Sequence, residues 1–266
     1  MVEKKVKVGI IGLGNMGGAV AQALSKIENV ELLLSHHNLQ KAQALQDQIG
    51  GTLADNETIA AQTQVLFLGV KPRLIGKVLA ELEVSLAENT DLICISMAAG
   101  VTLTDLVALH PSEKWLRMMP NTPVAIGQGM TTFATENDQV AQLFEKLMAK
   151  SGQVKRLPES LIDAATAIAG CGPAFVYEMI EAMSRAGVQN GLTVANAQVL
   201  AAQTLVGSAQ MVLESPLHPA QLRDQVTSPG GSTIAGLVAL QEEGFQASII
   251  SGVNRALKRT KESERR

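Results

Sequence analysis

The sequence predicts an α/β protein with an N-terminal Rossmann-type, doubly wound sheet and an all-helical C-terminal dimerisation domain. Strand-like and helical segments alternate through residues 1–157, a pattern typical of parallel sheets covered by helices. A glycine-rich turn, Gly12-Leu13-Gly14-Asn15-Met16-Gly17, directly follows the first strand and opens the first helix. From Ser160 onward nearly every segment has helical periodicity. We therefore predict one domain over 1–157 and a helical domain over 158–266, with Pro158 at the boundary.

The first domain is predicted from its apolar runs in chain order. β-branched and aliphatic runs predict strands at 6–11, 30–34, 65–70, 92–96 and 115–119. Helical periodicity lies between them, at 15–26, 39–48, 72–87 and 103–109. A strand-like segment at 131–134, a helix at 138–150 and a strand at 153–157 complete the domain.

The second domain is predicted to consist of six helices. They span 161–169, 174–186, 194–213, 220–226, 234–242 and 246–261. The segment 193–211 has apolar or small residues around most of its circumference, which a single small domain cannot bury. We expect these helices to pack against a second copy, as a homodimer.

Composition narrows the classes of protein. The 266 residues are 46% hydrophobic and 18% charged, with a net charge of −3, which indicates a soluble globular protein and no nucleic-acid groove. Two cysteines, Cys94 and Cys171, lack metal-ligand spacing, so we expect no metal site, no disulfide framework and a reducing compartment. The N-terminal residues lack a signal-peptide pattern and no apolar run reaches membrane-spanning length. We predict a cytoplasmic protein without membrane contact.

The glycine-rich turn predicts a dinucleotide site. Gly12 permits the tight turn, Gly14 admits a pyrophosphate, and Gly17 lets the helix approach the sheet. Because the motif lies between a strand and a helix, a dinucleotide is favoured over a glycine-rich loop without a ligand.

The end of the second strand indicates which dinucleotide binds. The segment Ser35-His36-His37-Asn38 has no acidic residue to hold the ribose hydroxyls of NAD. We expect NADPH, with NADH as a weaker alternative. Ser35, His36, Asn38 and Lys41 are candidates to bind a 2′-phosphate. For the pair His36-His37 the alternative is an exposed strand end and turn, as well supported as phosphate contact for His37 and less so for His36.

Two further segments lie at predicted strand ends, where doubly wound sheets bind ligands. They are Val70-Lys71-Pro72 and the run from Met118 to Pro123, in which Asn121 or Thr122 is a candidate to meet a nicotinamide carboxamide. Both segments are explained equally well as ordinary strand ends that lead into loops. Lys71 could contact a ligand or equally face solvent.

A second glycine-rich turn lies far along the chain and indicates an anion site. Within the segment 225–237, Ser228, Thr233 and the pair Gly230-Gly231 precede an apolar helix. Hydroxyls and backbone N–H groups at a helix N-terminus suit a carboxylate. The alternative is a simple turn in which Ser232 or Thr233 caps the helix.

These motifs together resemble pyrroline-5-carboxylate reductases. The resemblance rests on the 12–17 turn, Val70-Lys71-Pro72, the segment 96–101, and above all on Arg117-Met118-Met119-Pro120-Asn121-Thr122-Pro123 and the segment 226–237. It implies NADPH-dependent reduction of 1-pyrroline-5-carboxylate to L-proline, the last step of proline synthesis, in a dimer that can assemble further. One departure is Cys171, where the family more often has serine.

The resemblance also implies roles for individual residues. Ser228, Gly231 and Ser232 would surround the substrate carboxylate, and the Thr233 hydroxyl would meet the ring nitrogen. The cofactor would contact the 12–17 turn, Asn56, the Val70-Lys71-Pro72 turn and Asn121.

Two other functions agree less well with the sequence. A β-hydroxyacid dehydrogenase needs a catalytic lysine in its second domain, but there is no lysine between Ser160 and Lys258. A regulatory protein that senses NADPH without turnover would not need the anion turn at 228–233.

Overall fold

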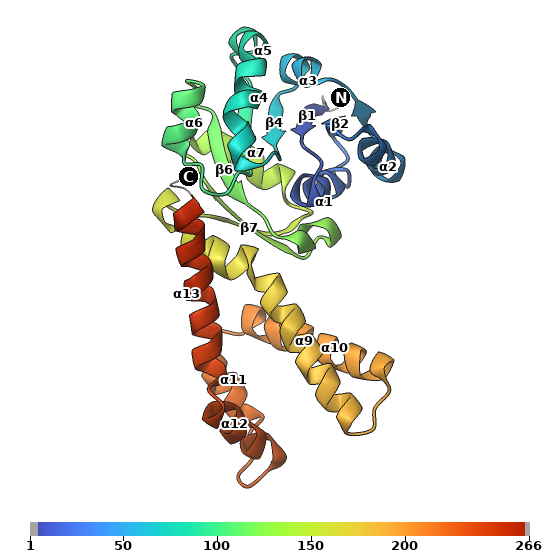
Figure 1. Cartoon of the computed structure of the whole chain (residues 1–266), viewed down its shortest axis with the longest axis vertical. Helices are drawn as coiled ribbons and strands as arrows, with labels where there is room; N and C mark the ends of the chain where they lie inside the picture. The colour runs from blue at the N-terminus through green and yellow to red at the C-terminus, as the bar shows by residue number, and fades with distance from the viewer. Residues whose placement is uncertain (1–4, 264–266) are drawn as a thin grey trace. The chain divides into compact units, whose positions relative to one another are not determined.

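The structure is a computed structural model that describes residues 5–263 (Figure 1). The chain divides into two compact units. One unit holds the described chain up to Cys171 together with the residues from Ala256 onward, and the other spans Gly172–Arg255. The domain boundary that the sequence predicts, after residue 157, stays a prediction.

The first unit is built on one eight-stranded sheet in the order β3-β2-β1-β4-β5-β6-β7-β8. The strands are β1 (Val6–Ile11), β2 (Val30–Ser35), β3 (Thr52–Leu53), β4 (Val65–Leu68), β5 (Ile93–Ser96), β6 (Trp115–Met119), β7 (Gly129–Ala134) and β8 (Gly152–Arg156). All neighbours pair in parallel except β6 and β7. The predicted doubly wound architecture is therefore confirmed.

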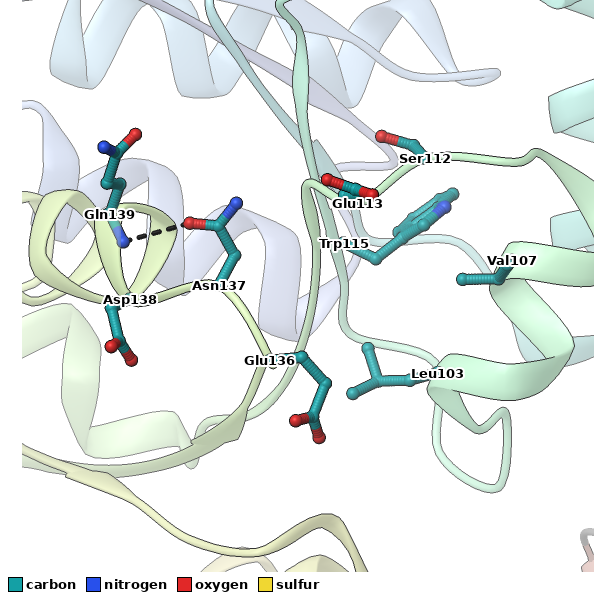
Figure 2. Close-up of a pocket in the computed structure, with 9 residues that line it drawn as sticks. All are labelled: Leu103, Val107, Ser112, Glu113, Trp115, Glu136, Asn137, Asp138 and Gln139. Carbon is teal, nitrogen blue, oxygen red and sulfur yellow. Dashed lines mark hydrogen bonds between the residues drawn. The ribbon is translucent and has the colours of Figure 1, made fainter.

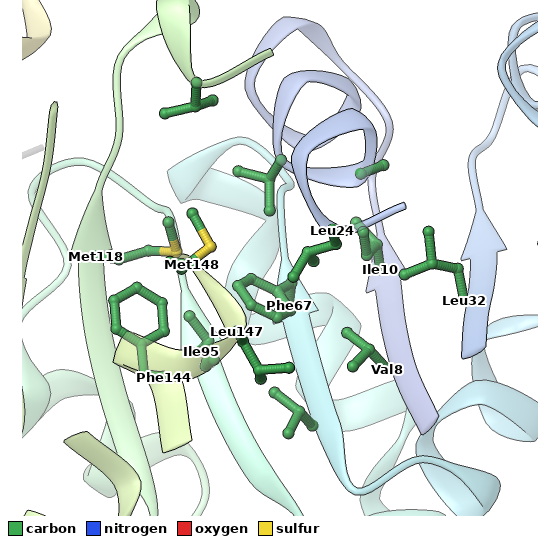
Figure 3. Close-up of a cluster of buried hydrophobic side chains, with 14 of the residues drawn as sticks. Val8, Ile10, Leu24, Leu32, Phe67, Ile95, Met118, Phe144, Leu147 and Met148 are labelled. Carbon is green, nitrogen blue, oxygen red and sulfur yellow. The ribbon is translucent and has the colours of Figure 1, made fainter. Parts of the chain in front are cut away.

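Helices cover both faces of the sheet, because alternate side chains of a strand point to opposite faces. The helices are α1 (Asn15–Leu24), α2 (Leu39–Ile49), α3 (Asn56–Gln62), α4 (Ile75–Glu81), α5 (Glu83–Glu88), α6 (Leu103–Leu109) and α7 (Asp138–Leu147). On one face, Ile10 and Phe67 pack with Leu24 of α1 and Phe144 of α7 (Figure 3). On the other face, α3 to α6 pack against the remaining strand residues, among them Leu66.

The sheet differs from the prediction at its far edge. β7 runs antiparallel to β6, although the sequence suggests only parallel pairs. The link from Met119 to Gly129 contains only the short 3₁₀ helix η2 (Thr122–Ile126), and a parallel return needs a crossover of a dozen or more residues. A short connection therefore forces the strand to reverse.

Three smaller elements also differ. The predicted helix 72–87 is divided into the 3₁₀ helix η1 (Pro72–Leu74), α4 and α5, with a break at the buried Leu82. β3 and α3 were not predicted, because two strand residues and seven helical residues are too few to set a period.

A buried arginine ties the chain that follows the sheet to β6. Arg117 has a side chain only 2% exposed and pairs with Asp163 at 2.7 Å and Glu159 at 3.4 Å. A Glu159 carboxylate oxygen also accepts a hydrogen bond from the Leu103 backbone N–H at the start of α6, at 2.7 Å. This network fixes η3 (Glu159–Leu161) and α8 (Ile162–Ala165) against the sheet.

The predicted helix 161–169 contains a change of helix type. After α8 the chain forms a π-helix over Thr166–Gly170, closed by a bond from the Cys171 N–H to the Thr166 carbonyl at 3.0 Å. By length and composition alone, the helical run Glu159–Gln189 is long and apolar enough to cross a membrane. Its uncharged stretch covers only residues 164–177, so the sequence expectation of no membrane contact stays a prediction.

The second unit is helical throughout, as predicted. It contains α9 (Gly172–Gln189), α10 (Val194–Glu214), α11 (Pro219–Gln225), α12 (Ser232–Glu242) and the first part of α13 (Phe245–Ser263). Within Gly172–Arg255 only three side chains are buried, those of Ser184, Ala197 and Ala201. Large apolar side chains of α10 are exposed instead: Val199, Leu200, Val206, Met211 and Leu213.

Candidate functional site

The carboxyl ends of β1, β2 and β4 meet at one edge of the sheet. Ile11, the last residue of β1, is in register with Ser35 of β2 on one side and Leu68 of β4 on the other. The chain order reverses across β1, so this edge is the topological switch point at which open α/β sheets bind ligands.

Three glycines make the turn at this edge compact. Gly12 has a φ of +98°, and a Cβ at Gly17 would lie 1.9 Å from the Gly12 carbonyl oxygen. A Cβ at Gly69, after β4, would lie 2.4 Å from the same oxygen. Side chains are therefore excluded from the space where two loops and the start of α1 come together, as a dinucleotide turn requires.

Gly14 differs from these glycines and gives a clean test of the turn. A Cβ there would meet no atom within 4 Å, and Gly14 is the N-cap of α1 with a φ of −69°. We expect Gly14→Ala to change the free energy of unfolding by at most about 1 kcal/mol but to weaken NADPH binding by roughly tenfold or more, because the methyl group occupies the approach of the pyrophosphate. Thermal melting and fluorescence titration with NADPH measure the two effects. Unchanged NADPH affinity would contradict a cofactor site at this turn.

A cleft of about 410 Å³ opens beside the glycine turn. It is lined by the ends of β1 and β2, the start of α3, and α4 with the loop before it: Ile11, Gly12, Ser35, His36, His37, Asp55, Asn56, Val70, Leu74, Lys77, Val78 and Glu81. Six residues predicted from sequence or resemblance, Gly12, Ser35, His36, His37, Asn56 and Val70, thus line one cleft.

The polar groups at the end of β2 are held by specific contacts. The Ser35 hydroxyl donates to the Asn56 side-chain oxygen at 2.6 Å. Asn38 is the N-cap of α2, where its side chain accepts from the Lys41 N–H at 3.0 Å. The Asn38 amide oxygen therefore caps α2, and only the NH₂ group of Asn38 remains to donate to a phosphate.

The turn at 228–233 has the features of an anion site. Gly230 has a φ of +70°, and the Gly231 N–H donates to the Ser228 carbonyl at 3.1 Å. Gly231 is the N-cap of α12 without a side-chain capping bond, so the alternative in which Ser232 or Thr233 caps the helix is wrong. In the described chain, no side-chain hydrogen bond engages the hydroxyls of Ser228, Ser232 and Thr233.

Comparisons with known proteins bear on both units. The family model for pyrroline-5-carboxylate reductase dimerisation matches residues 159–263, and the model described as NADP oxidoreductase, coenzyme F420-dependent, matches residues 7–100. The chain is 39% identical over 265 residues to the pyrroline-5-carboxylate reductase of Synechocystis sp., covering 97% of this chain and 98% of that relative. The chain belongs to the pyrroline-5-carboxylate reductase family.

Further relatives and solved structures place the whole chain in this reductase family. The Escherichia coli K12 pyrroline-5-carboxylate reductase is 37% identical, with 96% of this chain and 97% of that protein covered. The Coxiella burnetii pyrroline-5-carboxylate reductase structure matches with a TM-score of 0.87 at 31% identity, covering 97% of this chain and 98% of that one. The Plasmodium falciparum pyrroline carboxylate reductase, solved with NADP bound, matches with a TM-score of 0.84 at 30% identity, with the same coverage of each chain.

Asn121 of this reductase-family chain has a structural task. Its side-chain NH₂ donates to the Ala169 carbonyl at 3.0 Å, and its oxygen accepts from the Met130 N–H at 2.9 Å. The amide therefore joins the loop after β6 to the π-helix and to β7. The Asn121 amide keeps a second N–H and a second acceptor site. Its contact with a nicotinamide stays a prediction.

The other segments of the family motif are placed as follows. Lys71 is exposed and is the N-cap of η1, with Pro72 at its first helical position. Cys171, the departure from the family pattern, is half-buried and carries a free thiol. Burial raises the pKa of the other free cysteine, Cys94, to about 12, which keeps that thiol unreactive.

Three charged cleft residues were missed by the sequence reasoning. Asp55 is the N-cap of α3 and accepts from the Thr58 N–H at 2.7 Å and the Thr58 hydroxyl at 3.0 Å. The Thr58 N–H is the main cause of the lowered pKa of Asp55. Lys77 and Glu81 reach the cleft from α4. The Asp-x-x-Thr capping spacing was the available signal for Asp55, whereas nothing local marks Lys77 or Glu81.

A more spacious cavity, of about 730 Å³, lies elsewhere on the first unit (Figure 2). Trp115 borders it and begins β6, so the cavity is at the amino end of that strand, away from the ligand-binding edge. The indole N–H of Trp115 donates to the His110 carbonyl at 2.9 Å, and Asp138 pairs with Arg156 at 2.6 Å. The cavity thus lies at the opposite end of β6 from the ligand-binding edge of the sheet, so volume alone does not identify the site.

Proposed function

We propose that the protein reduces 1-pyrroline-5-carboxylate to L-proline with NADPH, the last step of proline synthesis. The observation that carries the proposal is the turn at 228–233, whose hydroxyls have no partner in the described chain, in a member of a family named for this reaction. A dinucleotide turn and an anion turn on one chain suit a reductase that acts on a small carboxylate.

The residues of the first unit fit a dinucleotide. The glycine turn is compact because a Cβ at Gly12 or Gly17 would clash with backbone atoms, whereas Gly14 borders open space at the N-terminus of α1. Ser35 at the end of β2 and Asn56 at the start of α3 offer polar groups in the cleft. The segment that follows β2 has no acidic residue to hold the ribose hydroxyls of NAD, and the Asp55 carboxylate in the same cleft is bonded to Thr58. Bound NADPH supplies the hydride.

The turn before α12 suits the substrate carboxylate. The helix has 11 residues, so its first N–H groups carry the partial positive charge of a helix N-terminus. The backbone N–H of Ser232 and the Ser228 hydroxyl are the donors we assign to the carboxylate. The Gly231 N–H already donates to the Ser228 carbonyl, so Gly231 shapes the turn around the carboxylate rather than donating to it. Each charge-assisted hydrogen bond contributes about 1.5–3 kcal/mol when shielded from water.

The reaction adds a hydride to the carbon of the C=N bond and a proton to the nitrogen. A protonated cyclic imine is already electrophilic, so the protein needs to position the ring and exclude water rather than supply a strong acid. We assign Thr233 to the ring nitrogen, as a hydrogen-bonding and orienting group.

We also propose that the chain works as a homodimer through its helical unit, in the cytoplasm, and that dimers assemble further. The match to a dimerisation domain over 159–263 supports a self-associating helical region. The exposed apolar side chains of α10 supply the surface. Burial against a second copy would also explain why the helical run Glu159–Gln189 is apolar, and no membrane is needed to cover it.

Activity of the wild-type protein tests the proposed reaction, and the Thr233→Ala variant tests the role assigned to that hydroxyl. We expect wild-type protein to oxidise NADPH, followed at 340 nm, only when 1-pyrroline-5-carboxylate is present. In Thr233→Ala the turnover number should fall roughly tenfold to a hundredfold, the value of one charge-assisted hydrogen bond, while the NADPH dissociation constant stays unchanged.

Thr260→Ala is the matched control, because the Thr260 hydroxyl bonds within its own helix to the Ala256 carbonyl at 3.1 Å. Tight NADPH binding with no imine-dependent oxidation in the wild type would overturn the proposed reaction. Full activity in Thr233→Ala would overturn only the role of that hydroxyl.

A further inference from the structure

The phosphate end of the cofactor cleft carries a cluster of basic side chains at the start of α2. The rings of His36 and His37 lie edge to face, with centroids 4.2 Å apart. Lys41 follows in the first turn of α2, near enough to act electrostatically on His36. The cluster combines with the positive end of the α2 helix dipole.

The His36 ring is incompletely satisfied in the free protein. Its Nδ1 atom is buried and has no hydrogen-bond partner among the described residues. Protonation would place an N–H at this nitrogen with no acceptor to receive it, which is costly in a buried position. The geometry therefore favours the neutral ring until an anion arrives.

The surroundings of His36 also favour its neutral form. Burial, followed by the charges of His37 and Lys41, lowers the pKa of His36. Asp55, Lys77 and Glu81 line the same cleft. The Asp55 carboxylate accepts two bonds from Thr58, and Glu81 pairs with Lys77 at 3.7 Å. No hydrogen bond in the described structure links His36 to an acidic side chain.

We propose that His36 takes up a proton from solvent when the 2′-phosphate of NADPH enters this cleft, and that this proton uptake strengthens the preference for NADPH over NADH. The inference rests on the proposed function and concerns the same cleft. A ribose 2′-phosphate is a dianion above about pH 6, so it supplies the negative charge that the cluster lacks. NADH has a hydroxyl there and brings no such charge.

The sign of the pH dependence follows from linkage. The phosphate raises the pKa of His36 from its lowered value in the free protein, so the complex binds more protons than the free protein does. NADPH affinity should be highest at low pH within the range where the phosphate is a dianion. It should then fall by up to about tenfold per pH unit from pH 6.5 to 8.5. NADH affinity should stay constant over that range.

Titration calorimetry of the full chain tests the proposal directly. NADPH and NADH are each titrated at pH 7.5 in two buffers with different ionisation enthalpies, which gives the number of protons taken up. We expect about 0.5–1 proton for NADPH and none for NADH. The His36→Gln variant should lose the NADPH proton uptake and keep its NADH affinity.

His110→Gln is the matched control. His110 is also a partly buried histidine whose pKa burial lowers, but it packs edge to face against Trp115, with ring centroids 6.4 Å apart, outside the cleft. Its removal should leave the proton count unchanged. NADPH binding without proton uptake, or uptake that persists in His36→Gln, would overturn this inference alone. A failure of NADPH to bind at all would overturn the proposed function as well.

Discussion

Replacing Arg117 by methionine is expected to lower the free energy of unfolding by about 3–5 kcal/mol, the cost of removing one partner from a buried ion pair. The guanidinium is only 2% exposed and is the partner of both Asp163 and Glu159. Methionine fills much of the arginine volume, so the loss comes from two carboxylates that remain shielded from water without their counter-charge. The segment 159–165 should detach from β6 first.

Urea unfolding at fixed protein concentration measures this effect. Lys114→Met is the matched control, because the Lys114–Asp91 pair has the same 2.7 Å distance but side chains 33% and 96% exposed. That variant should lose at most about 1 kcal/mol. Adding Glu159→Gln and Asp163→Asn to Arg117→Met should recover part of the loss. A change below about 1 kcal/mol in Arg117→Met would show that the pair does not hold the segment.

Gly17→Ala is expected to abolish measurable NADPH binding and to destabilise the first unit. The new Cβ would lie 1.9 Å from the Gly12 carbonyl oxygen, far inside van der Waals contact, and the obstacle is backbone that cannot rotate away. Either α1 or the turn after β1 must move. Overpacking of this kind costs about 1–3 kcal/mol or more, and it displaces the N–H groups that would face the pyrophosphate.

The neighbouring glycine provides the control. A Cβ at Gly18 would have its nearest atoms at 3.9 Å, so Gly18→Ala should keep NADPH affinity and gain about 0.5–1 kcal/mol from the better helix propensity of alanine. Calorimetric titration with NADPH and thermal melting distinguish the two variants. Equal NADPH affinity in both would mean that the approach of α1 to the turn does not shape the site.

The parts of the fold that the sequence predicted are those with strong periodic signals. The strand 6–11 and the helix beginning at Asn15 were correct because an apolar run, a glycine turn and an amphipathic helix agree there. The direction of β7 depends on the length of the connection that precedes it rather than on the hydrophobic pattern of the strand. The helix break at Leu82 has no neighbouring glycine or proline that would predict it. Tertiary packing decides such positions.

The candidate site was predictable to a similar extent. The glycine turn and the end of β2 follow from motif and position, whereas Asn56 came only from the family resemblance. Its place beside Ser35 depends on the pairing of β2 with β3 and the start of α3, elements that local patterns did not reveal. Arg117 was visible within a family motif, but its ion pairs join residues 42 and 46 positions apart, a separation beyond the reach of sequence periodicity.

The helical unit has almost no interior of its own. Only Ser184, Ala197 and Ala201 are buried within Gly172–Arg255, although a segment of that length normally needs an apolar core to offset its loss of conformational entropy. In the homodimer that we propose, the surface of another copy completes this core. The stability of this half of the proposed homodimer would then depend on protein concentration, because association stabilises only the folded chain.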